Sequence, residues 1–108
     1  MIDPDKIYAH IMEAAKEWVS ADEEARRLKE LQPIVLAEIM NQCPDDCPSE
    51  TAKKSWAMAT PQYRLHVTNM VAAKTKANMA QARYKAAQNL AELRRSEESS
   101  RRAEMGMR

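Results

Sequence analysis

The residues best suited to chemistry in this chain are basic side chains in its second half. Lys76 and Arg83 are seven residues apart, so they share one face of a helix. A basic strip on a helix can bind phosphate groups along a nucleic acid without reading its bases, with an affinity that falls as salt rises. The candidate binding residues, for nucleic acid or another partner, are Arg64, Lys74, Lys76, Arg83, Lys85, Arg94, Arg95, Arg101 and Arg102.

A second interpretation of these basic residues follows from the charge of the two halves. Residues 1–59 carry 7 Lys/Arg and 12 Asp/Glu, a balance of −5, whereas residues 60–108 carry 10 and 4, a balance of +6. An acidic half that packs beside a basic half would favour antiparallel pairing. Glu92, Glu97, Glu98 and Glu104 also interrupt the end of the strip. A strip that is solvated, or that faces a protein partner, is therefore the alternative.

The two cysteines and two histidines do not form a recognisable metal motif. Cys43 and Cys47 have three residues between them, whereas zinc sites usually have two or four, and only His10, His66 or a second copy could supply further ligands. We expect no metal and no cofactor. Because a cytosolic setting is expected, we predict two free thiols rather than a local disulfide.

The sequence also lacks the common catalytic motifs. A di-iron bundle needs a glutamate three residues before the histidine, where this chain has Ile7 and Tyr63. There is no HExxH, no glycine-rich phosphate loop and no nucleophile elbow. We therefore expect a non-enzymatic protein without a small-molecule substrate.

The basic residues belong to a long helix predicted over residues 61–95. Thr60 can cap it, Pro61 suits its first position, and no further Gly or Pro occurs before Gly106. Apolar or small residues recur at spacings of three and four, which we call the seam of the helix. This seam consists of Tyr63, His66, Met70, Ala73, Ala77, Ala80, Tyr84, Ala87 and Ala91. Its small alanines would let a partner helix approach closely.

A helix with its own seam is predicted over residues 5–41, with Asp3 as its cap and Pro4 at its start. Pro33 removes a hydrogen bond to the carbonyl of Lys29, but the periodicity continues through it, so a kinked helix is favoured over a break near Gln32. The seam consists of Ile7, Ile11, Ala14, Trp18, Ala21, Ala25, Leu28, Gln32, Val35 and Ile39.

Shorter segments complete the predicted domain, which covers residues 1–95. Residues 42–50 are the linker, and residues 51–59 form a short helix in which Trp56 and Met58 cover one end of the bundle. Residues 96–108 are a polar and basic extension that we expect to fray in the isolated chain.

These elements predict an all-α fold, a long antiparallel helical hairpin with a short capping helix. A lone hairpin with thin apolar stripes is marginally stable, so we expect a homodimer that forms a four-helix bundle. Neither a secretory signal nor an apolar run of about 18 residues is present, so we expect no membrane partner and a cytoplasmic location.

The end of the chain resembles a known class of proteins. Residues 93–105 read Leu-Arg-Arg-Ser-Glu-Glu-Ser-Ser-Arg-Arg-Ala-Glu-Met and follow a helix rich in Tyr, Ala and Gln. This last third resembles the ending of small helical proteins of tailed bacteriophages and prophages, often encoded among early genes for DNA replication and recombination. The resemblance implies a virus-encoded accessory protein, located in the cytoplasm of the host cell, that binds host or phage components.

The expected function is therefore that of a non-enzymatic accessory protein. It would bind a macromolecular partner, in DNA recombination or replication, through its basic C-terminal helix. One alternative is an inhibitor or adaptor that binds a host defence or nuclease complex. Another is a structural or assembly bundle.

Overall fold

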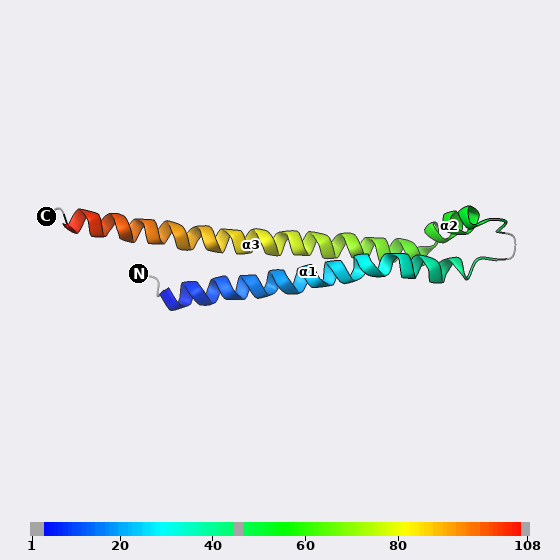
Figure 1. Cartoon of the computed structure of the whole chain (residues 1–108), viewed down its shortest axis with the longest axis horizontal. Coiled ribbons are helices and arrows are strands. Elements are labelled where there is room, and N and C mark those ends of the chain that lie inside the picture. The colour runs from blue at the N-terminus through cyan, green and yellow to red at the C-terminus, as the bar shows by residue number, and fades with distance from the viewer. Residues whose placement is uncertain (1–3, 45–46, 107–108) are drawn as a thin grey trace. The chain divides into compact units, whose positions relative to one another are not determined.

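The computed structural model describes residues 4–44 and 47–106, and its secondary structure within these ranges is helical. The helices are α1 (Pro4–Met40), α2 (Glu50–Met58) and α3 (Pro61–Gly106) (Figure 1). No strand occurs in the described ranges, and α1 and α3 pack as a hairpin, so the predicted fold class is confirmed. Asp3, the predicted cap of the first helix, lies outside the described residues.

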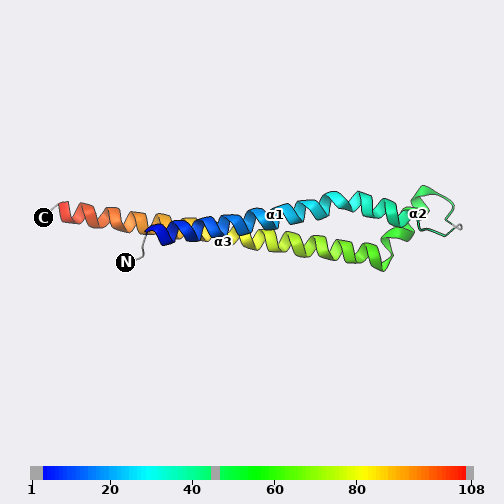
Figure 2. The ribbon, with the colours of Figure 1, turned by 90° about the horizontal axis from the view of Figure 1, so that it is seen from below.

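The chain divides into two compact units. Unit 1 is formed by Met1–Val19 and Asn78–Arg108, and unit 2 by Ser20–Ala77. Within each unit, segments of α1 and α3 lie side by side and run in opposite directions (Figure 1, Figure 2). The sequence predicted one domain over residues 1–95 and did not indicate a division inside the long helices.

In unit 1 the two helices meet mainly through small side chains. Ala14, Ala80 and Ala87 are buried, and the ring centroids of Trp18 and Tyr84 stack 5.3 Å apart. Ile7, Ile11 and Ala91 are half-buried. The contact is close because alanine places little between the two backbones, but it buries little apolar surface for its length.

Unit 2 contains the turn of the hairpin and the larger apolar cluster. Ile39, Ala57 and Tyr63 are buried together, and the half-buried apolar residues packed against them are Val35, Leu36, Met40, Trp56 and Val67. Toward the middle of the long helices, Ala21, Ala25 and Ala77 are buried and Leu28, Met70 and Ala73 are half-buried. All seam positions of both helices are thus buried or half-buried within their own unit.

The short helix α2 begins at a clear capping residue. The hydroxyl of Ser49 accepts a hydrogen bond from the backbone N–H of Ala52 at 3.1 Å. Trp56 packs against the apolar cluster as expected, whereas Met58 is 44% exposed and is not among the residues packed against that cluster. Thr60 caps α3 by accepting a hydrogen bond from the N–H of Tyr63 at 3.2 Å.

The predicted end of the last helix is wrong. α3 continues to Gly106 instead of ending at residue 95, and in unit 1 it extends beyond the start of α1 (Figure 1, Figure 2). The segment has no proline, and Glu97 and Glu98 precede Arg101 and Arg102 by four residues, a spacing that favours helix. Local charge pattern therefore maintains a helix where the apolar seam has ended.

α1 continues through Pro33 as a single helix, so the break considered near Gln32 does not occur. Nearby, Nε2 of His66 lies 3.0 Å from the carbonyl oxygen of Leu28, which assigns the proton to Nε2 in this contact. The imidazole thus supplies a hydrogen bond to the backbone of α1 in the turn before the proline.

The loop after α1 corrects the prediction of free thiols. Cys43 and Cys47 form a disulfide, with their Cα atoms 6.6 Å apart. The bond was not expected because the cysteines were assigned to a reducing compartment, and not because their spacing forbids it. None of the described helices is long and apolar enough to cross a membrane.

Candidate functional site

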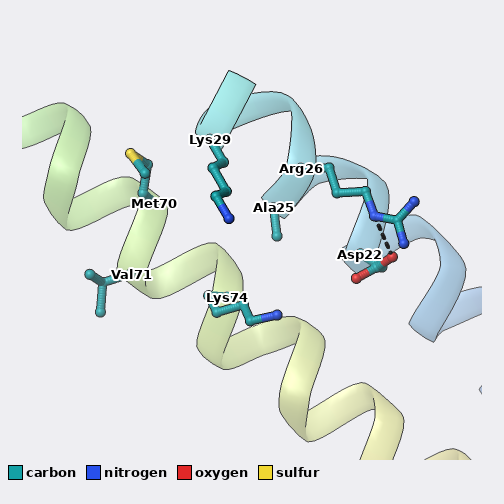
Figure 3. A pocket seen from close by; sticks show the side chains of 7 residues that line it. All are labelled: Asp22, Ala25, Arg26, Lys29, Met70, Val71 and Lys74. Atoms are coloured by element: carbon teal, nitrogen blue, oxygen red, sulfur yellow. Dashed lines mark ion pairs between the residues drawn. The ribbon is translucent and has the colours of Figure 1, made fainter. Parts of the chain in front are cut away.

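A groove between α1 and α3 in unit 2 gathers three basic side chains (Figure 3). It has a volume of about 450 Å³. Its lining consists of Asp22, Ala25, Arg26, Lys29, Met70, Val71 and Lys74. We call this the cation groove.

The seam positions explain why the lysines meet there. Ala25 and Met70 are seam residues, and Lys29 and Lys74 each follow one of them by four residues. Side chains four residues apart share a helix face, so both lysines stand at the edge of the contact between the helices. Figure 3 shows the Lys29 side chain extending from α1 toward the space between the helices, with Lys74 on the facing part of α3.

The charges in the cation groove are not balanced. Nε of Arg26 lies 3.0 Å from Oδ2 of Asp22, so the single carboxylate of the groove is paired within α1. Within the described part of the chain, Lys29 and Lys74 make no ion pair with a carboxylate. The lining therefore carries three positive charges and one negative charge, a formal excess of +2.

An excess of this kind favours an anion. Neighbouring like charges repel each other, and an anionic group between them would remove that repulsion and form charge-assisted hydrogen bonds. The side chain of Arg26 is 76% exposed, and both lysines are exposed. The charged ends of these side chains are thus open to solvent, where salt would screen the attraction of an anion.

Lys76, another predicted binding residue, lies in a different electrostatic setting. The pKa of Glu24 is below its ordinary value, first because Arg27 donates a hydrogen bond to its carboxylate, with Nη2 to Oε1 at 2.7 Å. Desolvation of the carboxylate acts in the opposite direction and raises the pKa, while the positive charges of Arg27 and Lys76 lower it further. The charge of Lys76 on α3 is therefore partly balanced by an acid on α1.

Arg83 lies against acids in unit 1. A groove of about 470 Å³ there is lined by Arg83, Glu13 and Glu17, together with His10, Ala14, Ala86, Ala87 and Leu90. We call it the acidic groove. Lys76 and Arg83, which the seven-residue spacing placed on one strip, thus both stand near carboxylates of α1. This agrees with the interpretation that acidic and basic halves pair.

Arg94 takes a seam position in place of an apolar residue. It follows Ala91 by three residues and is half-buried, and its Nε is buried without a hydrogen-bond partner among the described residues. Because its guanidinium is partly enclosed within unit 1, Arg94 is less available to an external ligand than the sequence suggested.

The remaining predicted binding residues are exposed. They are Arg64 in unit 2 and Lys85, Arg95, Arg101 and Arg102 in unit 1. The three arginines in the exposed segment 95–106 are matched in number by Glu97, Glu98 and Glu104. The end of α3 is therefore exposed, but its charge is balanced.

Arg26 and Lys29 are the site residues that the sequence analysis missed. The positive total charge of the second half pointed to α3, and the negative total charge of the first half concealed these two residues of α1. Lys29 follows the seam residue Leu28 directly, as Lys74 follows Ala73. Equivalent edge positions of antiparallel helices face each other, so comparison of the two seams could have found the pair.

Among the described residues, no group of three His, Cys, Asp or Glu side chains is placed so that it could bind a metal ion. In comparisons with known proteins, no family model, curated protein or solved structure matches this chain. The cation groove and the exposed helix surfaces are therefore the basis for a functional proposal.

Proposed function

We propose that the chain is a non-enzymatic accessory protein that binds the sugar-phosphate backbone of nucleic acid at the cation groove. The observation that carries this proposal is the excess of positive charge at Arg26, Lys29 and Lys74; among the described residues, only Arg26 of these three is paired with an acid. Exposed lysines and arginines supply affinity for phosphate without base specificity. The resemblance to early proteins of tailed bacteriophages favours DNA recombination or replication as the setting.

The test is fluorescence anisotropy of labelled single- and double-stranded oligonucleotides, titrated at low and physiological salt. Lys29→Gln/Lys74→Gln should weaken binding at least tenfold and reduce the slope of log K against log salt by roughly 1.4 to 1.8, as expected for two lost phosphate contacts.

The matched control removes the same charge elsewhere in unit 2. Lys53→Gln/Lys54→Gln changes two lysines of α2, one of which lies 3.9 Å from Glu50. This control should retain nearly all binding. Equal losses in both double variants would mean that net charge, and not the cation groove, determines affinity. An absence of binding by the unmodified chain at low salt would reject the proposal.

A second candidate is an adaptor or inhibitor that binds a host protein through the end of α3. The specific observation is that residues 95–106 are exposed and balanced in charge, with Met105 74% exposed. Such a surface suits another helix better than it suits a polyanion. A host-protein complex would support this candidate if it survives nuclease treatment, is lost in Arg102→Glu/Met105→Glu, and persists in Lys29→Gln/Lys74→Gln.

A further inference from the structure

The acidic groove of unit 1 lies beside a strip of exposed apolar residues on α3. Met79 is 57% exposed, Leu90 45% and Leu93 57%, while the buried residues of α3 in this unit are the alanines Ala80 and Ala87. Of the larger apolar side chains of α3 in this unit, Tyr84 packs on Trp18 of α1, whereas Met79, Leu90 and Leu93 stay largely exposed. A hairpin that covers its alanines and exposes its larger apolar residues gains little from burial until a further surface covers them.

The strip is nearly symmetric about one small residue. Met79 and Leu93 each lie seven residues from Ala86, and Arg83 and Leu90 lie three residues before it and four after it. When two copies of α3 cross in opposite directions with both Ala86 side chains at the centre, Met79 of each copy meets Leu93 of the other. Arg83 then lies within one residue of the level of Leu90 of the second copy.

At this level of the contact, the two copies also present opposite charges to each other. Leu90 lines the acidic groove, where Glu13 and Glu17 share the lining with the single Arg83 of the same copy, so an Arg83 from a second copy would arrive beside an excess of carboxylates. The lining of the groove also includes Ala86, which is exposed and small enough to allow the helix of a second copy to approach closely. Apolar contacts at both ends, small residues in the centre and opposite charges at the edge all match a second copy of this chain.

We propose that the acidic groove and this strip form a self-complementary surface, occupied by α3 of a second copy that runs antiparallel with Ala86 at the two-fold axis. This surface is separate from the cation groove, so the proposal goes beyond nucleic-acid binding and does not depend on it. It assigns a specific face to the dimer that the sequence predicted.

Sedimentation analysis of the full chain over a range of concentrations should give a species of twice 12.3 kDa. Ala86→Glu should weaken the dimer at least about tenfold, because it places two carboxylates at the centre of the contact. Gln88→Glu is the matched control, since it also adds one carboxylate at an exposed position of α3, two residues later and on the opposite side of the helix from Ala86. It should leave the dimer nearly unchanged.

A cysteine pair tests the same geometry without relying on a destabilised variant. Ala86→Cys should form a covalent dimer under mild oxidation, because each new thiol meets its own copy at the two-fold axis, whereas Gln88→Cys, on the opposite side of α3, should not. A chain that stays monomeric at all concentrations would overturn the proposal. A dimer that resists Ala86→Glu, or that cross-links equally through Gln88→Cys, would overturn it too.

Discussion

The indole of Trp18 stacks on the phenol ring of Tyr84, with an interplanar angle of 30° and centroids 5.3 Å apart. This is the one contact between large aromatic side chains in a unit whose buried residues, within the described ranges, are alanines. Because Trp18 is half-buried, Trp18→Ala should lower the free energy of unfolding by about 2 to 4 kcal/mol, less than for a fully buried ring.

Chemical denaturation followed by circular dichroism measures this effect, and Tyr84→Phe is its control. Phenylalanine keeps the ring and removes only the hydroxyl, which accepts a hydrogen bond from Nε2 of Gln88 at 2.9 Å on the exposed side. The control should change stability by less than about 1 kcal/mol. An unchanged midpoint in Trp18→Ala would show that the stack contributes nothing.

Tyr63 connects α3 to α1 near the turn of the hairpin. Its ring is buried beside Ile39, and its hydroxyl accepts a hydrogen bond from Nε2 of Gln32 at 2.9 Å. Tyr63→Phe should cost about 0.5 to 1.5 kcal/mol, because the amide of Gln32 loses a partly buried partner. A double-mutant cycle with Gln32→Ala should give a coupling energy of similar size. Additive effects of the two substitutions would contradict this interpretation.

Replacing a buried seam alanine with a larger residue should destabilise the contact between the helices. Ala80 is 2% exposed and lies where α3 contacts α1 in unit 1. Ala80→Leu should therefore separate the helices or strain the side chain, at a cost of about 1 to 3 kcal/mol in thermal or denaturant unfolding. Ala82→Leu adds the same atoms at an exposed position and should be nearly neutral. A stabilised Ala80→Leu variant would mean that the contact has unfilled space.

The seam was readable from the sequence because a spacing of three and four depends only on residue type. Every position from Ile7 to Ile39 and from Tyr63 to Ala91 on the two seams is buried or half-buried. The end of α3 was not readable in this way. Residues 95–106 have no apolar seam, and their helix depends on local charge spacing, which is a weaker signal.

Counting charges along the chain could not reveal the cation groove. Lys29 lies in the acidic half and Lys74 in the basic half, and their relation exists only after the helices pair. The Cys43–Cys47 disulfide was mispredicted for another reason, since the argument relied on cellular compartment. The periodic pattern of one helix gives neither the position of a side chain on a second helix nor the chemical surroundings of a cysteine pair.

The last prediction concerns Pro33, which lies inside α1 and cannot donate a hydrogen bond to the carbonyl of Lys29. Pro33→Ala should restore that bond, and an alanine also favours helix in an interior turn. We expect the free energy of unfolding to rise by about 1 to 3 kcal/mol in denaturant titrations, provided that the seam on either side keeps its contacts. Slower hydrogen exchange at residue 33 and its neighbours would identify the new bond. A loss of stability would instead mean that packing in unit 2 requires the backbone shape that the proline imposes. Because Lys29 belongs to the cation groove, a stable Pro33→Ala variant with reduced nucleic-acid affinity would further show that this shape positions its ammonium group.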